Sequence, residues 1–256
     1  MVDVHCHILP GLDDGPHTME ESIAMAESAI AEGTTHVVAT PHSSERFRFD
    51  YEQVRQLRDD LQSRLGNRVR IATGCDFHLN RENLDALRKE PRRYCINQRD
   101  YLLVEFNEIS IPPAMDQTLH GLQLSGLRLI VTHPERNAIL RTHEERLRDW
   151  VRRGCFVQVT GGALTGGFGP TAQQIAMRWI SEGIVHIVAS DAHNMRNRPL
   201  RLQPAYDAVA EQFGEDKALA LFQENPLAAF EGRELPHIPE LGEAPPPRRR
   251  KRFFFF

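Results

Sequence analysis

Residues 2–7 read Val-Asp-Val-His-Cys-His, and this stretch indicates both how the chain folds and where its chemistry lies. Its first residues predict a buried β-strand that ends in polar side chains. Alternate residues of a strand point to the same face, so His5 and His7 can reach one metal ion. Asp3 shares that face and is expected to orient one of the imidazoles by contacting it without binding the metal itself. By itself, a His-x-His pair fits two structural histidines as well as it fits a metal site.

Six further apolar runs follow, separated by longer amphipathic segments. The runs are rich in Val and Ile and about 4–6 residues long, which is typical of buried parallel strands. Alternation of strands and helices predicts a parallel sheet, open or closed. We therefore predict an α/β protein with about seven strands. They cover residues 2–5, 36–39, 69–74, 101–105, 127–132, 156–159 and 185–189.

The first predicted helix has signals at both ends. Thr18 can cap its start, and Glu21 completes a capping box three residues later. Gly33 is a suitable residue to end it. Further helices are predicted at about residues 50–65, 113–124, 142–153, 171–182 and 200–213, with short ones after them.

Composition limits the class of protein. The 256 residues are 41% hydrophobic and 26% charged, the balance of an ordinary globular protein. A formal net charge of -4 and the lack of a basic strip argue against a nucleic-acid partner. We find no signal peptide and no transmembrane segment, so we expect a cytoplasmic protein. The four cysteines have no C-x-x-C spacing, and no disulfide framework is expected. The oligomeric state stays open.

The end of the chain differs in character from the rest. We predict one domain over residues 1–238 and a disordered tail over residues 239–256. The tail contains three consecutive prolines, which do not join a regular element easily, then five basic residues and four phenylalanines. Such a tail could touch a membrane surface or an acidic partner, or it could have no role.

Polar residues of metal-ligand type follow six of the seven predicted strands. The carboxyl ends of parallel strands meet at one end of an α/β fold, where sites form. Asp14 is included, although the Asp-Gly pair that it forms with Gly15 is also an ordinary turn signal. So many such residues at strand ends predict a metal site. The candidate ligands are His5, His7, Asp14, His42, Asp76, Glu105, His133, Asp191 and His193.

The number and type of these ligands narrow the chemistry. Nine exceed what one ion can use, so we predict two or three ions with some carboxylates bridging. Nitrogen and oxygen ligands without a required thiolate suit Mn²⁺, Fe²⁺ or Zn²⁺. Adjacent ions favour in-line attack of activated water on phosphorus, although amide or ester hydrolysis also fits the metals.

Arginines beside two of the candidate ligands favour phosphate as the group attacked. Arg136 follows His133 by three residues, and Arg198 follows His193 closely. Guanidinium groups match phosphate oxygens in a bidentate way. Arg196 could belong either to the site or to the solvated surface.

Other features receive no role in the chemistry. Cys6 and Cys75 lie beside candidate ligands but are expected to point away as small buried hydrophobes. The glycines at 161–162 and 166–167 are only weakly like a phosphate cradle, and a flexible lid fits them equally. The histidines interpreted as structural are His17, His36, His186 and His78, the last close enough to Asp76 to lie at the rim of the site.

Six motifs lie in order along the chain: Asp3-Val4-His5-Cys6-His7, Leu12-Asp13-Asp14-Gly15, Thr40-Pro41-His42, Leu103-Val104-Glu105-Phe106, Thr132-His133-Pro134-Glu135-Arg136 and Ser190-Asp191-Ala192-His193-Asn194. Together they resemble the PHP (polymerase and histidinol phosphatase) superfamily. More narrowly, they resemble its bacterial manganese-dependent protein-tyrosine phosphatase branch, the capsular-polysaccharide (CpsB/CapC) type. The resemblance runs from Met1 to about Gly232.

This resemblance implies a distorted (β/α)₇ TIM-like barrel that holds up to three metal ions, usually manganese. It implies phosphotyrosine on a cognate bacterial tyrosine kinase as substrate, within the control of capsule or exopolysaccharide synthesis. It also implies that Arg136 and Arg198 bind the phosphoryl group. One departure is Asp76, because the branch typically has Glu at this position. The alternatives are a PHP phosphoesterase for a small phosphate monoester such as histidinol phosphate, and a non-catalytic metal-holding scaffold.

Overall fold

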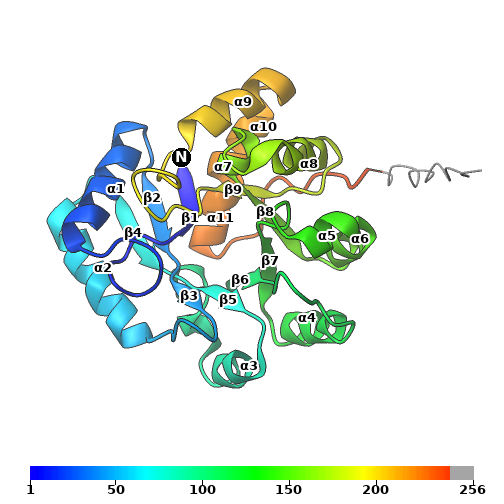
Figure 1. Cartoon of the computed structure of the whole chain (residues 1–256), viewed down its shortest axis with the longest axis horizontal. Coiled ribbons are helices and arrows are strands. Elements are labelled where there is room, and N and C mark those ends of the chain that lie inside the picture. The colour runs from blue at the N-terminus through cyan, green and yellow to red at the C-terminus, as the bar shows by residue number, and fades with distance from the viewer. Residues whose placement is uncertain (243–256) are drawn as a thin grey trace, which may run out of the picture.

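Parallel strands form the centre of the protein, and helices surround them (Figure 1). The structure is a computed structural model that describes residues 1–242. Residues 243–256, which make up most of the predicted tail, lie outside the described residues. The strands are β1 (Val2–Cys6), β2 (His36–Ala39), β3 (His42–Ser43), β4 (Arg70–Thr73), β5 (Asp76–His78), β6 (Tyr101–Glu105), β7 (Arg128–Thr132), β8 (Phe156–Thr160) and β9 (Ile187–Ala189).

The strands form two parallel sheets, in the orders β1-β2-β4 and β3-β5-β6-β7-β8-β9. Only two residues separate β2 from β3, and two separate β4 from β5, so both chain segments pass from the first sheet into the second. They stay paired across this break: the Gly74 N–H donates to the Ala39 carbonyl (2.8 Å), and the Asp76 N–H donates to the Pro41 carbonyl (3.2 Å). These two segments therefore join the sheets along one side.

The other side is joined by β1 and the residues that follow β9. The Asp191 N–H donates to the His5 carbonyl (2.8 Å), and the His7 N–H donates to the Ala192 carbonyl (2.9 Å). Within residues 1–242, seven strand positions thus close into a distorted barrel, which confirms the predicted fold. The short strands β3 and β5 were not among the predicted elements.

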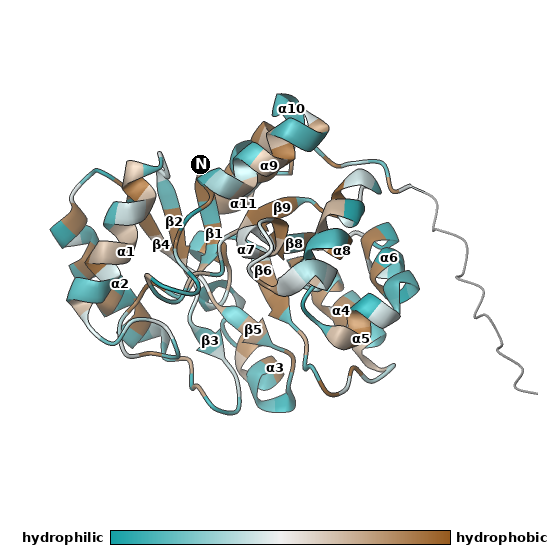
Figure 2. Ribbon diagram, turned by 45° about the horizontal axis from the view of Figure 1, so that its top comes forward, coloured by the Kyte–Doolittle hydropathy of each residue, from teal (hydrophilic) through white to brown (hydrophobic). Residues whose placement is uncertain are grey.

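Helices pack around the barrel, and Figure 2 shows the hydrophobic residues concentrated on the strands that they cover. The predicted capping box is present in α1: the Glu21 N–H donates to Thr18 Oγ1 (3.2 Å), and the Glu21 carboxylate accepts from the Thr18 N–H (3.3 Å). The helices are α1 (Met19–Ala31), α2 (Tyr51–Leu65), α3 (Arg81–Leu87), α4 (Met115–Leu124), α5 (Ala138–Thr142), α6 (Glu144–Arg152), α7 (Gly161–Leu164), α8 (Gly169–Ser181), α9 (Gln203–Phe213), α10 (Glu215–Leu219) and α11 (Asn225–Glu231), with short turns η1 (Pro91–Arg93), η2 (Ile96–Gln98) and η3 (Ala220–Glu224).

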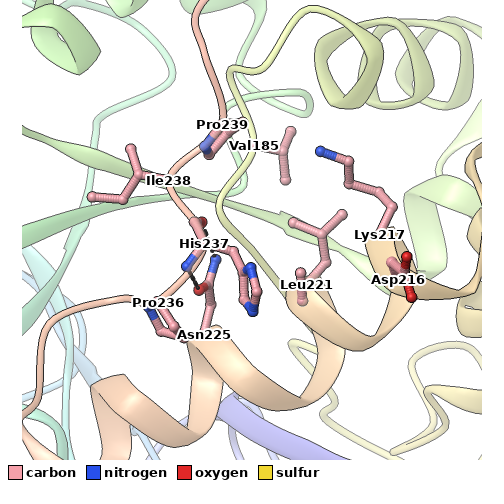
Figure 3. Close-up of a pocket in the computed structure, with 10 residues that line it drawn as sticks. Val185, Asp216, Lys217, Leu221, Asn225, Pro236, His237, Ile238 and Pro239 are labelled. Atoms are coloured by element: carbon pink, nitrogen blue, oxygen red, sulfur yellow. Dashed lines mark hydrogen bonds between the residues drawn. The ribbon is translucent and has the colours of Figure 1, made fainter.

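The end of the barrel where β9 begins is covered by α11 and the segment that follows it. The Asn225 amide donates to the carbonyls of His186 (2.8 Å) and His237 (2.7 Å) and accepts from the His237 N–H (3.0 Å). A pocket lies beside these hydrogen bonds, between Val185 and Ile238 (Figure 3). Because Val185 precedes β9, the pocket is at the opposite end from the residues that follow the strands.

The ordered fold extends slightly beyond the predicted domain boundary at 238. The Gly242 N–H donates to the Glu182 carbonyl (2.8 Å), and the Arg148 guanidinium donates to the Gly242 carbonyl (3.0 Å). Residues 239–242, assigned by the sequence to the tail, therefore lie against α8 and the turn after it. Among residues 1–242, every helix is too short or too polar to span a bilayer.

Candidate metal centre

The nine predicted ligands lie together at the end of the barrel where the strands end. With one further residue, His78, they form overlapping groups in which the nitrogen and oxygen atoms lie within 4.8 Å of one another. The groups are His7, Asp14, His42 and His193; His5, His7 and Asp76; His5, His133 and Asp191; His42, His78 and Glu105; and Asp76, Glu105 and His133.

The two histidines of β1 are each oriented by a neighbour that the sequence did not reveal. Their Nε2 atoms lie 3.3 Å apart. Nδ1 of His5 is 3.0 Å from Oε1 of Gln158 on β8, and Nδ1 of His7 is 2.7 Å from Oδ2 of Asp13. Both partners are acceptors, so each Nδ1 carries a proton and each Nε2 points into the site. The sequence analysis assigns no role in the site to Asp13 or Gln158.

The prediction that Asp3 orients an imidazole is wrong. Its Oδ1 accepts from the backbone N–H groups of His5 (3.3 Å) and Ser190 (3.0 Å), and its Oδ2 accepts from the Ser190 hydroxyl. Residues two apart on a strand are separated by about 6–7 Å, so the short Asp side chain reaches across to the end of β9 instead of along β1. Asp3 therefore ties β1 to β9 below the site. Burial raises its pKa to about 6, against the lowering effect of the bonds from Ser190.

Asp76 occupies the middle of the cluster. Its Oδ2 is 3.1 Å from Nδ1 of His42, 3.7 Å from Nε2 of His5 and 4.0 Å from Nε2 of His133. The carboxylate of Glu105 lies next to it, 3.4 Å from Nδ1 of His42 and 3.7 Å from Nε2 of His133. Although Asp is one methylene shorter than Glu, Asp76 reaches imidazoles that come from three different strand segments.

His78 lies closer to the centre than the rim position that the sequence suggested. It follows Asp76 by two residues on β5 and so points to the same face. Its Nε2 contacts Oε2 of Glu105. On the open side of the cluster, Oδ1 of the half-exposed Asp14 is 3.5 Å from Nε2 of His42 and 3.3 Å from Nε2 of His193.

The bonding state of these atoms fits a divalent cation. Among residues 1–242, five buried atoms of the cluster have no hydrogen-bond partner. Each of them lies near an imidazole or a carboxylate, but burying a polar atom without a hydrogen bond is still costly. Two or three cations that prefer nitrogen and oxygen ligands would satisfy these atoms. The atoms are His42 Nδ1, Asp76 Oδ2, Glu105 Oε2, Asp191 Oδ1 and His193 Nε2.

The pKa shifts of the imidazoles go in both directions. Burial acts to lower the pKa of His7, but Asp13 and its other partners raise it to about 9, so a bound cation would displace a proton there. Burial lowers the pKa of His5 to about 4, although Asp76 and Asp191 raise it, so the imidazole is in the neutral form that binds metals. Burial also acts to raise the pKa of Asp191, but the neighbouring His5, His7, His133 and Arg136 hold it well below its usual range. Asp191 is therefore an anion at neutral pH.

Asp191 links the cluster to the two predicted phosphate-binding arginines. Its Oδ1 lies 3.4 Å from Nε2 of both His5 and His7, and its Oδ2 forms ion pairs with Arg136 and Arg198. Both arginine side chains are mostly buried, at 22% and 23% exposed. The structure thus places both guanidinium groups at the edge of the cluster. Arg196, by contrast, is exposed, and its backbone N–H donates to Asn194.

Two residues of the cluster have backbone conformations that the sequence does not signal. His133 has φ of 34° and Asp191 has φ of 52°, in the left-handed region that residues other than glycine rarely adopt. Strain of this kind persists where the surrounding structure enforces it, and it is concentrated at functional sites. Here it occurs one residue after the end of β7 and two residues after the end of β9.

Comparisons with known proteins agree with this geometry. A family model described as capsular polysaccharide synthesis, CpsB/CapC, matches residues 1–231. The tyrosine-protein phosphatase YwqE of Bacillus subtilis is 33% identical over 220 residues, which are 84% of this chain and 86% of YwqE. The tyrosine-protein phosphatase CpsB of Streptococcus pneumoniae is 30% identical over 241 residues, covering 88% of this chain and 96% of CpsB.

Solved structures extend the comparison to three dimensions. One comes from crystal structures of YwqE from Bacillus subtilis and CpsB from Streptococcus pneumoniae, described as unique metal-dependent tyrosine phosphatases. It matches with a TM-score of 0.87 and 31% identity, over 95% of this chain and all of that chain (100%). A lactonase of Listeria monocytogenes, Lmo2620, shares the fold alone, with a TM-score of 0.57 and 13% identity over 91% of this chain and 95% of the lactonase.

Proposed function

The chain belongs to the CpsB/CapC family of capsular polysaccharide synthesis, and from this premise we propose that it is a metal-dependent protein-tyrosine phosphatase. Its relatives YwqE and CpsB are tyrosine-protein phosphatases by name. One observation on this chain carries the proposal: a cluster of imidazole and carboxylate groups, with buried atoms that lack hydrogen bonds, adjoins two arginines through Asp191.

We propose that the nine predicted ligands hold two or three Mn²⁺ ions, with Fe²⁺ or Zn²⁺ as alternatives. Such ions, when bound, bring the pKa of water toward neutrality and neutralise charge on phosphoryl oxygens. Asp76 and Glu105 each take part in two of the ligand groups, which favours bridging roles for both. Gln158 and Asp13 hold the Nδ1 protons of His5 and His7, so that Nε2 is the ligand atom in each.

The arginines supply the contacts to the phosphoryl group. Arg136 and Arg198 share one carboxylate oxygen of Asp191, so their remaining N–H groups are available for phosphoryl oxygens. The leaving group is a phenolate, whose parent phenol has a pKa of about 10, and it departs without a strong general acid. The substrate class that we propose is phosphotyrosine on a bacterial tyrosine kinase that controls capsule or exopolysaccharide synthesis. This role is consistent with a cytoplasmic protein.

The test is phosphate release from a phosphotyrosine peptide. The metal-free protein is compared with protein given Mn²⁺, Mg²⁺ or Zn²⁺, alongside a His5→Ala variant and a His17→Ala variant, which changes an exposed histidine outside the cluster. We expect metal-dependent turnover that His5→Ala abolishes and His17→Ala leaves intact. Histidinol phosphate serves as the small-substrate comparison. A protein that binds metal but hydrolyses only the small monoester would overturn the assignment to phosphotyrosine.

A further inference from the structure

The glycine-rich stretch after β8 has no role in the function proposed so far. It forms α7 and a tight turn that leads into α8. The Gly167 N–H donates to the Gly162 carbonyl (2.7 Å), and Gly166 has φ of 84°. Glycine is needed at 166 because other residues rarely adopt this conformation. The turn brings the next residue, Phe168, back against α7.

Phe168 contacts both this turn and the candidate site. A Cβ at Gly162 would lie 3.0 Å from the Phe168 ring, so the ring rests directly on the glycine backbone. The Arg136 guanidinium carbon lies 4.3 Å from the centre of the same ring. This is the distance of a cation–π interaction. The stretch is thus built so that an aromatic ring reaches the guanidinium group.

The Arg136 guanidinium has no ion-pair partner of its own among the described residues to fix its position. Its ion-pair partner, Asp191, is shared with Arg198 and is itself a proposed metal ligand. An arginine side chain has many rotamers, and a guanidinium fixed in advance loses less entropy when it binds an anion. Among the cation–ring contacts within residues 1–242, none involves Arg198, so the support is specific to one of the two arginines.

We propose that Phe168 is a positioning residue for substrate binding, which holds the Arg136 guanidinium ready for the phosphoryl group, and that Gly162 is small so that the ring can reach it. This inference rests on the proposed function, in which Arg136 binds phosphate. It gives the glycine stretch a mechanical role in place of a direct contact with phosphate.

The test uses Phe168→Leu, which keeps an apolar side chain but removes the ring, and Phe168→Tyr, which keeps the ring. We measure KM and kcat on a phosphotyrosine peptide, and the Kd of inorganic phosphate for the metal-loaded protein by calorimetry. We expect Phe168→Leu to raise the phosphate Kd and KM about 5- to 10-fold with a smaller change in kcat, as the loss of one partly buried cation–π contact predicts. Phe168→Tyr should restore both to within about twofold. Gly162→Ala, whose Cβ would press on the ring, should shift the Kd in the same direction.

Double-mutant cycles separate positioning from general packing. In an Arg136→Ala background, Phe168→Leu should change the phosphate Kd no further, whereas in an Arg198→Ala background it should keep its full effect. Equal effects in both backgrounds would refute the proposal, as would a Phe168→Leu protein with unchanged Kd. If Arg136→Ala itself leaves phosphate binding intact, the phosphate-binding role of Arg136 falls together with this inference. If Arg136→Ala weakens binding and Phe168→Leu does not, the inference alone falls.

Discussion

Asp13→Asn is a sharp perturbation, because it changes one atom in a residue that touches no proposed substrate. The Asp13 carboxylate accepts three hydrogen bonds: from Nδ1 of His7 (2.7 Å), from the Gly15 N–H (2.9 Å) and from the His42 N–H (3.1 Å). An amide has a single acceptor oxygen, so at least one of these donors would face an NH₂ group instead.

The size of the effect follows from two independent considerations. The pKa of Asp13 lies at about 2 rather than 3.8, because His7 and the other donors outweigh the raising effect of burial. A difference of this size corresponds to about 2 kcal/mol of interaction with the anionic form. Loss of a carboxylate behind a metal-binding imidazole typically weakens metal binding about 10- to 100-fold, or about 1.4–2.8 kcal/mol. We therefore expect the Mn²⁺ Kd of Asp13→Asn to rise by one to two orders of magnitude.

Isothermal titration of metal-free protein with Mn²⁺ measures this Kd directly. Asp60→Asn, which removes one carboxylate charge from an exposed ion pair with Arg64, is the matched control and should bind Mn²⁺ as the parent protein does. An Asp13→Asn protein that melts normally and binds Mn²⁺ with unchanged affinity would refute the idea that Asp13 acts through His7.

Three other changes test separate parts of the structure. Burial lowers the pKa of His186 to about 4, and its Nδ1 accepts from the Val157 N–H (3.2 Å). As the pH falls, His186 is protonated in the unfolded chain before it is protonated in the folded protein. Its neutral, buried form therefore contributes fully to the free energy of unfolding above about pH 6.5, and up to about 3 kcal/mol of that free energy is lost as the pH falls to about 4. His186→Asn should flatten that part of the pH profile in thermal melts, and an unchanged slope would contradict the assignment. Gly183 has φ of 72°, and a Cβ there would lie 2.0 Å from the Glu240 carbonyl oxygen. Gly183→Ala should therefore lower the free energy of unfolding by about 1–3 kcal/mol in denaturant titrations. An unchanged free energy of unfolding would show that residues 239–242 contribute little to stability. His78→Ala should weaken Mn²⁺ binding about 10-fold in calorimetry by removing the contact with Glu105, and unchanged binding would exclude His78 from the centre.

Much of the barrel and its cluster could be predicted because the signals are local. Buried strands give short Val- and Ile-rich runs. His133 directly follows such a run, and His42 lies three residues after another. The strands β3 and β5 could not be predicted, since two or three residues are too few to show alternation.

The neighbours that orient the cluster depend on long-range contacts. Gln158 lies 153 residues from His5 in the sequence. The two side chains meet only in the closed barrel, where β9 separates β8 from β1. Asp3 was assigned incorrectly for the same reason, because its partner Ser190 lies 187 residues away. The contact between Phe168 and Arg136 likewise depends on the conformation of the glycine turn, which the sequence does not reveal.

Closure of the barrel has a thermodynamic consequence. The pairing of β1 with the residues after β9 brings together segments that are nearly two hundred residues apart, and each carries two proposed ligands, His5 and His7 on one and Asp191 and His193 on the other. An ion bound there bridges the two sides, so its binding free energy is linked to closure: at a free concentration 100 times its Kd it adds about 2.7 kcal/mol to the closed state. Contacts of such sequence separation also form late in folding, because the entropy of bringing the segments together is lost first. The free concentration of the proposed metal ion would therefore set the equilibrium stability of the closed barrel as well as the proposed activity at its open end.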